Sequence, residues 1–254
     1  MSDYFSKESE TKYMSNHQYS AWQSCEARAY AEYVTHEYKR ETSDAFIQGL
    51  YFEALYAGQE YTNEALRNKK GELYAKFANC PAMAIKCQKD KLFRMVASGE
   101  WQTELFGKIQ GHDFKCKLDY INHGKGWICD LKTTADFSDR WMNLDGKNTK
   151  VKWYEEWNYW RQMAIQKELA EQTYGKRHEV YIAAVTKQAP PNLDVLDFNN
   201  PKRLNLELIS MASRLDRIKW CKQGKVELTR CGFCDYCRST KKLTTITKAE
   251  SVYG

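Results

Sequence analysis

The chain has 254 residues and a net charge of +6, with 39 lysines and arginines against 33 acidic residues. Hydrophobic residues at 43% and aromatic residues at 14% indicate a folded globule and argue against intrinsic disorder. No apolar run approaches the roughly 18 residues of a membrane span, and the polar N-terminus carries no secretory signal. We therefore expect a cytoplasmic protein with no membrane partner, whose basic excess suits a phosphate-rich partner without requiring one.

A chain of this length is most economically one domain with appended helices. We expect residues 1–15 to form a loose polar tail and residues 17–98 to form a helical region. An α/β core should follow over residues 102–198, and residues 203–254 should form a C-terminal helix and a cysteine-rich tail.

The N-terminal region has helical spacing. Residues 17–40 predict a helix in which Cys25 is most simply a small buried residue. Residues 44–57 predict a second helix, and Glu53 lies on its apolar stripe. A carboxylate there is costly unless it is paired or bound to a metal, so Glu53 is either a ligand or an edge residue with its head in water. Residues 61–98 predict two more helices.

A strand is expected over residues 102–110, and residues 111–134 then have the pattern of a β-hairpin. The turn is His123-Gly124-Lys125-Gly126, whose glycines can take positive φ. If this turn is the symmetric centre, Asp119 lies opposite Asp130 on one face, together with Lys132. The other face would be apolar and would pair Leu118 with Leu131 and Tyr120 with Cys129.

Two aspartates opposite each other repel, so this pair needs a compensating cation. Mg²⁺ suits the position because it favours one or two carboxylates with water and phosphate oxygens. Lys132, on the same face, could orient or deprotonate a metal-bound water. The alternative is a solvated face of exposed ion pairs, each worth little.

The second half of the chain continues the α/β pattern. Residues 135–150 are too irregular to predict an element, and residues 152–174 predict a long helix with Gln162 and Gln166 on its polar stripe. Residues 178–187 and 195–198 predict strands, and residues 203–222 predict a helix.

The cysteine-rich tail contains Cys231, Cys234 and Cys237 at two-residue gaps. An odd total of nine cysteines without a signal peptide indicates reduced thiols or metal ligands. Soft thiolates suit Zn²⁺ or an iron–sulfur cluster, and Cys221 is a local candidate for a fourth ligand.

Asp119 followed by Asp130-Leu131-Lys132 resembles the PD-(D/E)xK nuclease motif. The wider context resembles RecB-type phage exonucleases related to exodeoxyribonuclease VIII and lambda exonuclease. The matching pieces occur in the expected order and span most of the chain: Gly111 with Lys115, Lys117 and Asp119; Asp130-x-Lys132-Thr133; Tyr159-x-x-Gln162; and Cys231-x-x-Cys234-x-Tyr236-Cys237-Arg238.

This resemblance implies an α/β restriction-endonuclease-like core, with a central mixed sheet formed by strands near residues 104, 116, 129 and 182 and flanked by helices. It implies Mg²⁺-dependent hydrolysis of double-stranded DNA from its ends, 5′ to 3′, with one or two ions that Mn²⁺ can replace. Asp119, Asp130, Glu53 and the Leu131 carbonyl would hold the metal, and Lys132 would activate water. Arg140, Lys147 and Lys150 are candidates for contacts with the DNA backbone, although solvation explains them equally well.

Similar nucleases place a glutamine beside the catalytic lysine or a phosphate, followed by a tyrosine four residues later. Gln162 matches the glutamine, but Gln166 stands in place of the tyrosine, and an exposed Gln162 is the alternative. Some relatives hold a [4Fe-4S] cluster between one N-terminal and three C-terminal cysteines, which would make Cys25 the fourth ligand. Those relatives usually have a wider final gap, so zinc and unligated thiols remain alternatives.

The resemblance also implies a single-strand annealing partner, phage recombination in a bacterial host cell and a ring-like homo-oligomer. Two other functions remain open. One is an endonuclease of the restriction or junction-resolving kind. The other is a non-catalytic, zinc-dependent DNA-binding module for recombination.

Overall fold

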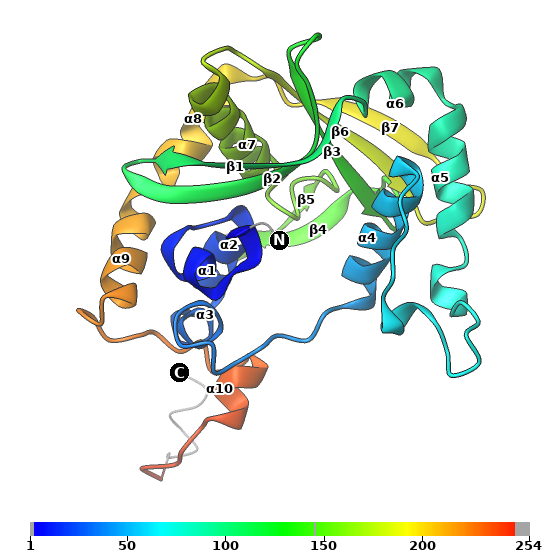
Figure 1. The fold of residues 1–254 in the computed structure, drawn as a ribbon. Coiled ribbons are helices and arrows are strands. Elements are labelled where there is room, and N and C mark those ends of the chain that lie inside the picture. Colours follow the sequence, from blue (N-terminus) through cyan, green and yellow to red (C-terminus); the bar gives the residue numbers. More distant parts are fainter. Residues whose placement is uncertain (1–2, 145, 247–254) are drawn as a thin grey trace.

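A computed structural model describes residues 3–144 and 146–246 of the chain. Its centre is a five-stranded sheet in the order β1-β2-β3-β6-β7, and β4 and β5 form a separate hairpin (Figure 1). β3 and β6 are parallel and the other neighbours in the large sheet are antiparallel, so the predicted mixed sheet is confirmed. The strands are β1 (Glu100–Ile109), β2 (His112–Asn122), β3 (Trp127–Thr134), β4 (Arg140–Leu144), β5 (Lys147–Val151), β6 (Glu179–Thr186) and β7 (Leu193–Asp197).

Helices cover both faces of the large sheet and bury an apolar core on each. The helices are α1 (Lys7–Lys12), α2 (Asn16–Ser24), α3 (Glu26–Tyr33), α4 (Asp44–Ala57), α5 (Cys80–Lys89), α6 (Lys91–Val96), α7 (Tyr159–Tyr174), α8 (Pro201–Ser210), α9 (Ala212–Lys222) and α10 (Asp235–Ser239), with short 3₁₀ turns at η1 (Asp3–Phe5), η2 (Glu64–Leu66) and η3 (Ala75–Phe77). One core joins α4, α5 and α6 to the sheet, and the other joins it to α7, α2 and α9. Within the described residues, no helix is long and apolar enough to cross a membrane.

Helix α4 begins and ends where the sequence predicts. The Ser43 side chain accepts a hydrogen bond from the Phe46 amide, which caps the N-terminus, and Gly58 ends the helix at a positive φ of 68°. Phe52 is fully buried against the sheet. Glu53, the next residue, therefore lies near β3, close to Asp130 and Lys132.

Strands β2 and β3 pair only near the turn that joins them. Tyr120 lies opposite Cys129 and Ile121 opposite Ile128, which confirms the predicted register for these two pairs, whereas the expected pairs of Asp119 with Asp130 and Leu118 with Leu131 are not part of the ladder. In the described chain the ladder goes no further towards Asp119, and Met14 pairs with β2 only at Phe114, six residues from Tyr120. The two strands therefore diverge beyond Tyr120, at the residues that carry the acidic motif.

The divergence of the strands overturns one detail of the predicted hairpin. Leu118 was expected to share a face with Tyr120 and Leu131. It packs instead in the core on the α7 side, together with Ile121, while Tyr120 and Leu131 pack in the core on the α4 side. The alternation of side chains is interrupted between Leu118 and Tyr120, where the β2–β3 ladder ends and the β1–β2 ladder skips Gln102, which has a positive φ of 59°.

The N-terminal residues form ordered structure, where the sequence predicted a loose tail. Residues 7–12 are helical, and Tyr4 and Ser9 are buried. The ammonium of Lys115, itself buried, donates to the Tyr4 carbonyl oxygen and to the Ser9 hydroxyl. The polar composition predicted a loose tail, but these residues accept hydrogen bonds from a buried lysine of the central sheet. No local sequence pattern indicates this contact.

Other boundaries differ from those predicted. The helix expected over residues 17–40 breaks at Cys25, which is extended at φ −166° and ψ 111°, and ends at Tyr33. The helix expected over 203–222 breaks at Met211, and the one expected over 152–174 begins only at Tyr159. The stretch judged irregular contains the β4–β5 hairpin.

Candidate active site

Four of the predicted site residues come from three elements that meet where β2 and β3 diverge. Glu53 lies on α4, Asp119 on β2, and Asp130 and Lys132 on β3. The carboxylate of Asp119 accepts a hydrogen bond of 2.7 Å from the Leu131 amide. A side chain thus occupies the place of the missing ladder bond, and this fixes both the Asp119 carboxylate and the Leu131 peptide at the site.

Asp130 is the most enclosed member of the group, with 2% of its surface exposed. Its Oδ1 accepts hydrogen bonds from Gln162 Nε2 at 2.6 Å and from Gln166 Nε2 at 2.8 Å, both on α7. Its Oδ2 is paired with the Lys132 ammonium. Helix α7 therefore holds one oxygen of Asp130, while the other is turned towards the lysine.

Gln166 was not expected at the site, because it replaces the tyrosine of similar nucleases. The structure gives it a direct, fully buried bond to Asp130. Its separation of four residues from Gln162, on one helix stripe, is the sequence signal that would have identified it. Tyr159 on the same helix also approaches the site, since the Lys132 ammonium lies 5.1 Å from its ring centroid.

The carboxyl groups shift one another's protonation. Burial, with a smaller contribution from Asp130, raises the pKa of Glu53 to about 7, although Lys132 opposes the shift. Burial and then the charges of Glu53 and Asp130 raise the pKa of Asp119 well above its usual value. These groups are therefore crowded acids that a cation would stabilise in their charged forms.

Lys132 compensates part of this negative charge. Burial alone would lower its pKa, but Asp130, Tyr159 and Asp119 outweigh burial and raise it. The lysine is therefore a charged ammonium tied to Asp130, and a divalent cation at the carboxylates would compete with it.

The donor set fits a hard divalent cation, because it consists of carboxylates and a backbone peptide. Among the described residues, however, only four cysteines bring their ligand atoms within 4.8 Å of one another. The three carboxylates are more widely spread, and Asp130 is engaged by Lys132. Asp119, Asp130 and Glu53 are the carboxylates that would hold such a cation.

The second site is the group of Cys25, Cys231, Cys234 and Cys237. The Sγ atoms of Cys25 and Cys237 lie 3.5 Å apart, and those of Cys231 and Cys237 lie 4.0 Å apart. Tetrahedral Zn–S bonds of about 2.3 Å place sulfurs roughly 3.8 Å apart, which matches this spacing. Backbone amides of Cys234 and Phe233 lower the pKa of Cys231 to about 6, which favours the thiolate that a metal requires.

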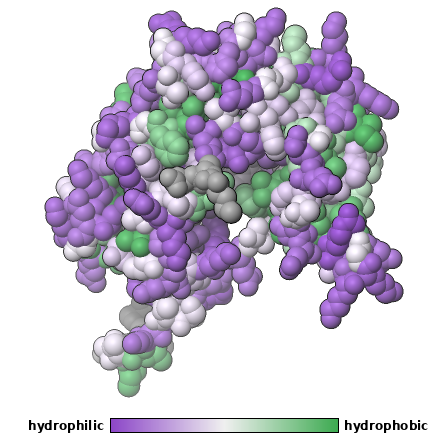
Figure 2. Space-filling model, in the orientation of Figure 1, coloured by the Kyte–Doolittle hydropathy of each residue, from purple (hydrophilic) through white to green (hydrophobic). Residues whose placement is uncertain are grey.

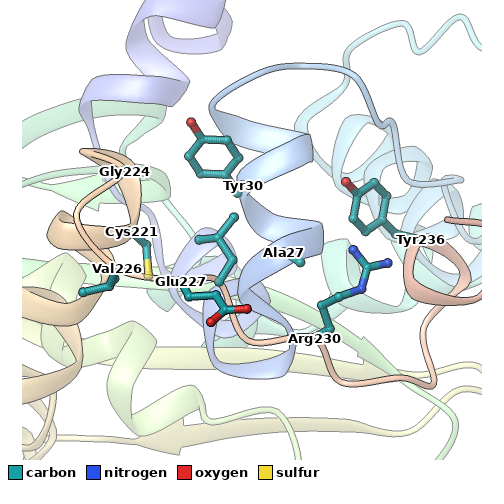
Figure 3. Close-up of a pocket in the computed structure, with 9 residues that line it drawn as sticks. Ala27, Tyr30, Cys221, Gly224, Val226, Glu227, Arg230 and Tyr236 are labelled. Atoms are coloured by element: carbon teal, nitrogen blue, oxygen red, sulfur yellow. The ribbon is translucent and has the colours of Figure 1, made fainter. Parts of the chain in front are cut away.

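The break between α2 and α3 explains why Cys25 reaches the C-terminal cysteines. Cys25 is the extended residue that precedes α3, and α10, which carries Cys237, lies beside α3 (Figure 1). Cys221, the local alternative, is fully buried and lies outside the group of four. It lines a cavity of about 410 Å³ with Tyr30 and Arg230, among others, beside the cysteine site (Figure 3).

A mixed sheet with an acidic pair and a lysine on two diverging strands defines the class of PD-(D/E)xK nuclease domains. A family model described as "PDDEXK-like domain of unknown function (DUF3799)" matches residues 15–240, and the chain belongs to this family. The chain is also similar to a crystal structure from Eubacterium rectale described as "Putative exonuclease", with a TM-score of 0.90 and 26% identity over 99% of this chain and 96% of that one. No curated protein sequence matches the chain significantly.

Proposed function

We propose that the protein is a Mg²⁺-dependent exonuclease that hydrolyses phosphodiester bonds at the ends of double-stranded DNA. The observation that carries this proposal is the meeting of Asp119, Asp130 and Lys132 in the gap between β2 and β3. The similarity to a protein described as an exonuclease supports action on ends. The 5′ to 3′ direction, a single-strand annealing partner, a ring-like oligomer and a role in phage recombination rest on the sequence resemblance.

Each residue has a role that follows from its position. Asp119, Asp130, Glu53 and the Leu131 carbonyl would hold Mg²⁺, which when bound lowers the pKa of a coordinated water and neutralises charge on the phosphate. Gln162 and Gln166 orient Asp130 through its Oδ1. Lys132, whose ammonium lies beside Asp130, would orient the attacking water or contact the phosphate.

The decisive variant is Lys132→Ala, compared with Lys125→Ala, the same change at an exposed residue of the β2–β3 turn. The wild type should degrade end-labelled linear duplex DNA with Mg²⁺, and Lys125→Ala should match it. Lys132→Ala should lose hydrolysis by about 100-fold or more, since a positioned group at the reacting atoms typically contributes 10²–10⁴. Equal degradation by Lys132→Ala would refute the catalytic assignment and favour a non-catalytic DNA-binding module.

The same assay tests the second nuclease function. An exonuclease needs an end, so covalently closed circular DNA should survive while linear DNA of the same sequence is degraded. Cutting of intact circles would instead indicate an endonuclease of the restriction or junction-resolving kind.

For the cysteine site we propose a structural metal centre, either one Zn²⁺ or a [4Fe-4S] cluster. The short sulfur separations favour a single tetrahedral ion, because the several iron atoms of a cluster hold their ligands further apart. Anaerobically purified protein distinguishes the two. A colourless protein with one zinc per chain would exclude the cluster, and a broad visible absorption with four irons would exclude zinc.

A further inference from the structure

The segment that contains the β4–β5 hairpin begins and ends close to Lys132. The chain leaves β3 at Thr134, two residues after Lys132, and returns at Tyr159, whose ring lies against the Lys132 ammonium. In the view of Figure 1 the hairpin lies between α2 and α4, outside the large sheet. The connection between β3 and α7 therefore begins and ends at the candidate active site.

Ion pairs, hydrogen bonds and ring contacts hold the two ends of this connection together. The Arg140 guanidinium donates to Asp136 Oδ1 at 2.9 Å and to the Ser138 carbonyl, and it lies 3.6 Å from Glu156. The Phe137 ring packs on the Trp153 ring with centroids 5.5 Å apart. Trp153 in turn packs on Tyr159 at 5.9 Å. These contacts connect the hairpin to the site through rings and ion pairs.

One face of the hairpin carries side chains suited to nucleic acid. Trp141 lies directly opposite Lys150 and Asn143 lies opposite Asn148, so these four residues share a face. Trp141 is 71% exposed, and the Lys150 side chain is 58% exposed. Hydrophilic residues cover much of the face drawn in Figure 2, and Trp141 is one of the exposed large hydrophobic side chains of the described chain.

The composition of this face favours nucleic acid over protein. An indole offers a surface on which any base can stack, a lysine attracts phosphate, and amides hydrogen-bond to bases or sugars. A protein-binding face would be expected to present several apolar side chains, whereas here Trp141 is accompanied by two asparagines and a lysine.

We propose that this hairpin face, defined by Trp141, Asn143, Asn148 and Lys150, binds the end of the DNA substrate, with Trp141 stacked on an unpaired terminal base and Lys150 on its phosphate. The proposal rests on the proposed nuclease function and assigns the hairpin a positioning role. For one strand to reach Lys132, the base pair at the DNA end has to open. The unpaired terminal base then lacks a stacking partner. Trp141, on the hairpin whose segment begins and ends near Lys132, would supply that partner.

The test compares Trp141→Ala with Trp220→Ala, which removes the same side chain from an exposed position on α9. Binding is measured with Ca²⁺ in place of Mg²⁺, using duplexes that carry 2-aminopurine in a short unpaired end. Wild type and Trp220→Ala should quench the 2-aminopurine fluorescence by stacking. Trp141→Ala should lose the quenching and bind such ends about 5- to 150-fold more weakly.

An abasic end separates stacking from other effects. When the terminal nucleotides lack bases, the wild type should bind as weakly as Trp141→Ala, because no base remains to stack. Lys150→Ala should weaken binding to both ends and flatten the salt dependence.

The outcomes separate this proposal from the one it rests on. If the wild type degrades linear DNA while Trp141→Ala binds, quenches and cuts as the wild type does, the hairpin proposal is wrong and the nuclease assignment stands. A wild type that neither binds nor cuts DNA would refute both, and would leave a protein partner as the ligand of this face.

Discussion

Replacing Glu53 by glutamine should stabilise the metal-free protein. The Glu53 carboxyl is buried beside Asp130 and Asp119, and burial with the Asp130 charge raises its pKa from 4.5 to about 7. The folded protein thus binds the Glu53 proton more tightly than the unfolded chain does. Charging this group costs folding free energy, and the cost grows as pH rises from 4.5 to about 7 and is complete above that.

The size of this effect follows from the shift. A change from 4.5 to about 7 corresponds to roughly 3 kcal/mol of lost stability at pH 8. Glu53→Gln has nearly the same shape and no charge, so it should be about 3 kcal/mol more stable than the wild type at pH 8. Near pH 4, where the wild-type carboxyl is protonated, the difference should vanish.

Urea denaturation followed by tryptophan fluorescence measures this difference. The buffer should lack Mg²⁺ and strong chelators, so that the cysteine site keeps any metal it holds. Glu60→Gln makes the same change at an exposed residue just beyond α4 and should behave as the wild type does. A Glu53→Gln variant that is less stable at pH 8, or whose advantage does not depend on pH, would refute the reasoning.

Added Mg²⁺ should reverse the order of stability. Binding to the folded state alone stabilises the wild type as the free concentration exceeds the dissociation constant. Glu53→Gln loses a charged ligand and should gain less. Because metal binding needs the ionised carboxyl, wild-type affinity for Mg²⁺ should also rise as pH increases through about 7.

Two further predictions concern Cys25 and Glu26, which contact the C-terminal part of the chain. Glu26 is buried, accepts from Arg217 Nε at 2.6 Å and from the Thr229 amide at 2.9 Å, and these partners overcome burial to lower its pKa to about 2. Glu26→Gln should therefore cost about 3–5 kcal/mol in urea denaturation at pH 7, a loss that shrinks as pH falls from 4.5 towards 2; a neutral result would refute the ion pair's role. Cys25→Ser should reduce the metal bound per chain, measured by elemental analysis, whereas Cys221→Ser should leave it unchanged; full metal content in Cys25→Ser would exclude Cys25 as a ligand.

The parts of the fold that local sequence encodes were predicted well. Helix α4 has both its cap at Ser43 and its stop at Gly58 in the sequence. The turn after β2 sets the pairing of Ile121 with Ile128, because two glycines fix where the chain reverses. Such features depend on residues within a few positions of each other, and a single sequence contains all of them.

The parts that depend on distant contacts were not predicted. Nothing near Lys115 indicates that its ammonium is satisfied by Tyr4 and Ser9, more than 100 positions away. The end of the β2–β3 ladder at Tyr120 has no local sequence signal either, and Met14 pairs with Phe114 of β2 from 100 positions away. The gap that holds the acidic residues is therefore a tertiary feature, although the residues themselves were identified.

The candidate site shows the same division. Asp119, Asp130 and Lys132 were found from motif spacing, and the structure brings them together. The sequence leaves the role of Gln166 open, because this residue stands where similar nucleases have a tyrosine. Its role follows from geometry, since a second amide on α7 can satisfy the same Asp130 oxygen as Gln162.

The two sites are connected through the N-terminal segment. Cys25 fixes the start of α3 to the C-terminal cysteines, and Glu26 beside it is bound to Arg217 of α9. From there the chain runs back through α2 to Met14, whose backbone bonds to Asp113 and Lys115 attach it to β2, the strand that carries Asp119. Loosening the cysteine site therefore loosens a segment that supports β2. For this reason Cys25→Ser should lower the rate of hydrolysis as well as stability, although its thiol is part of the cysteine group and not of the acidic site.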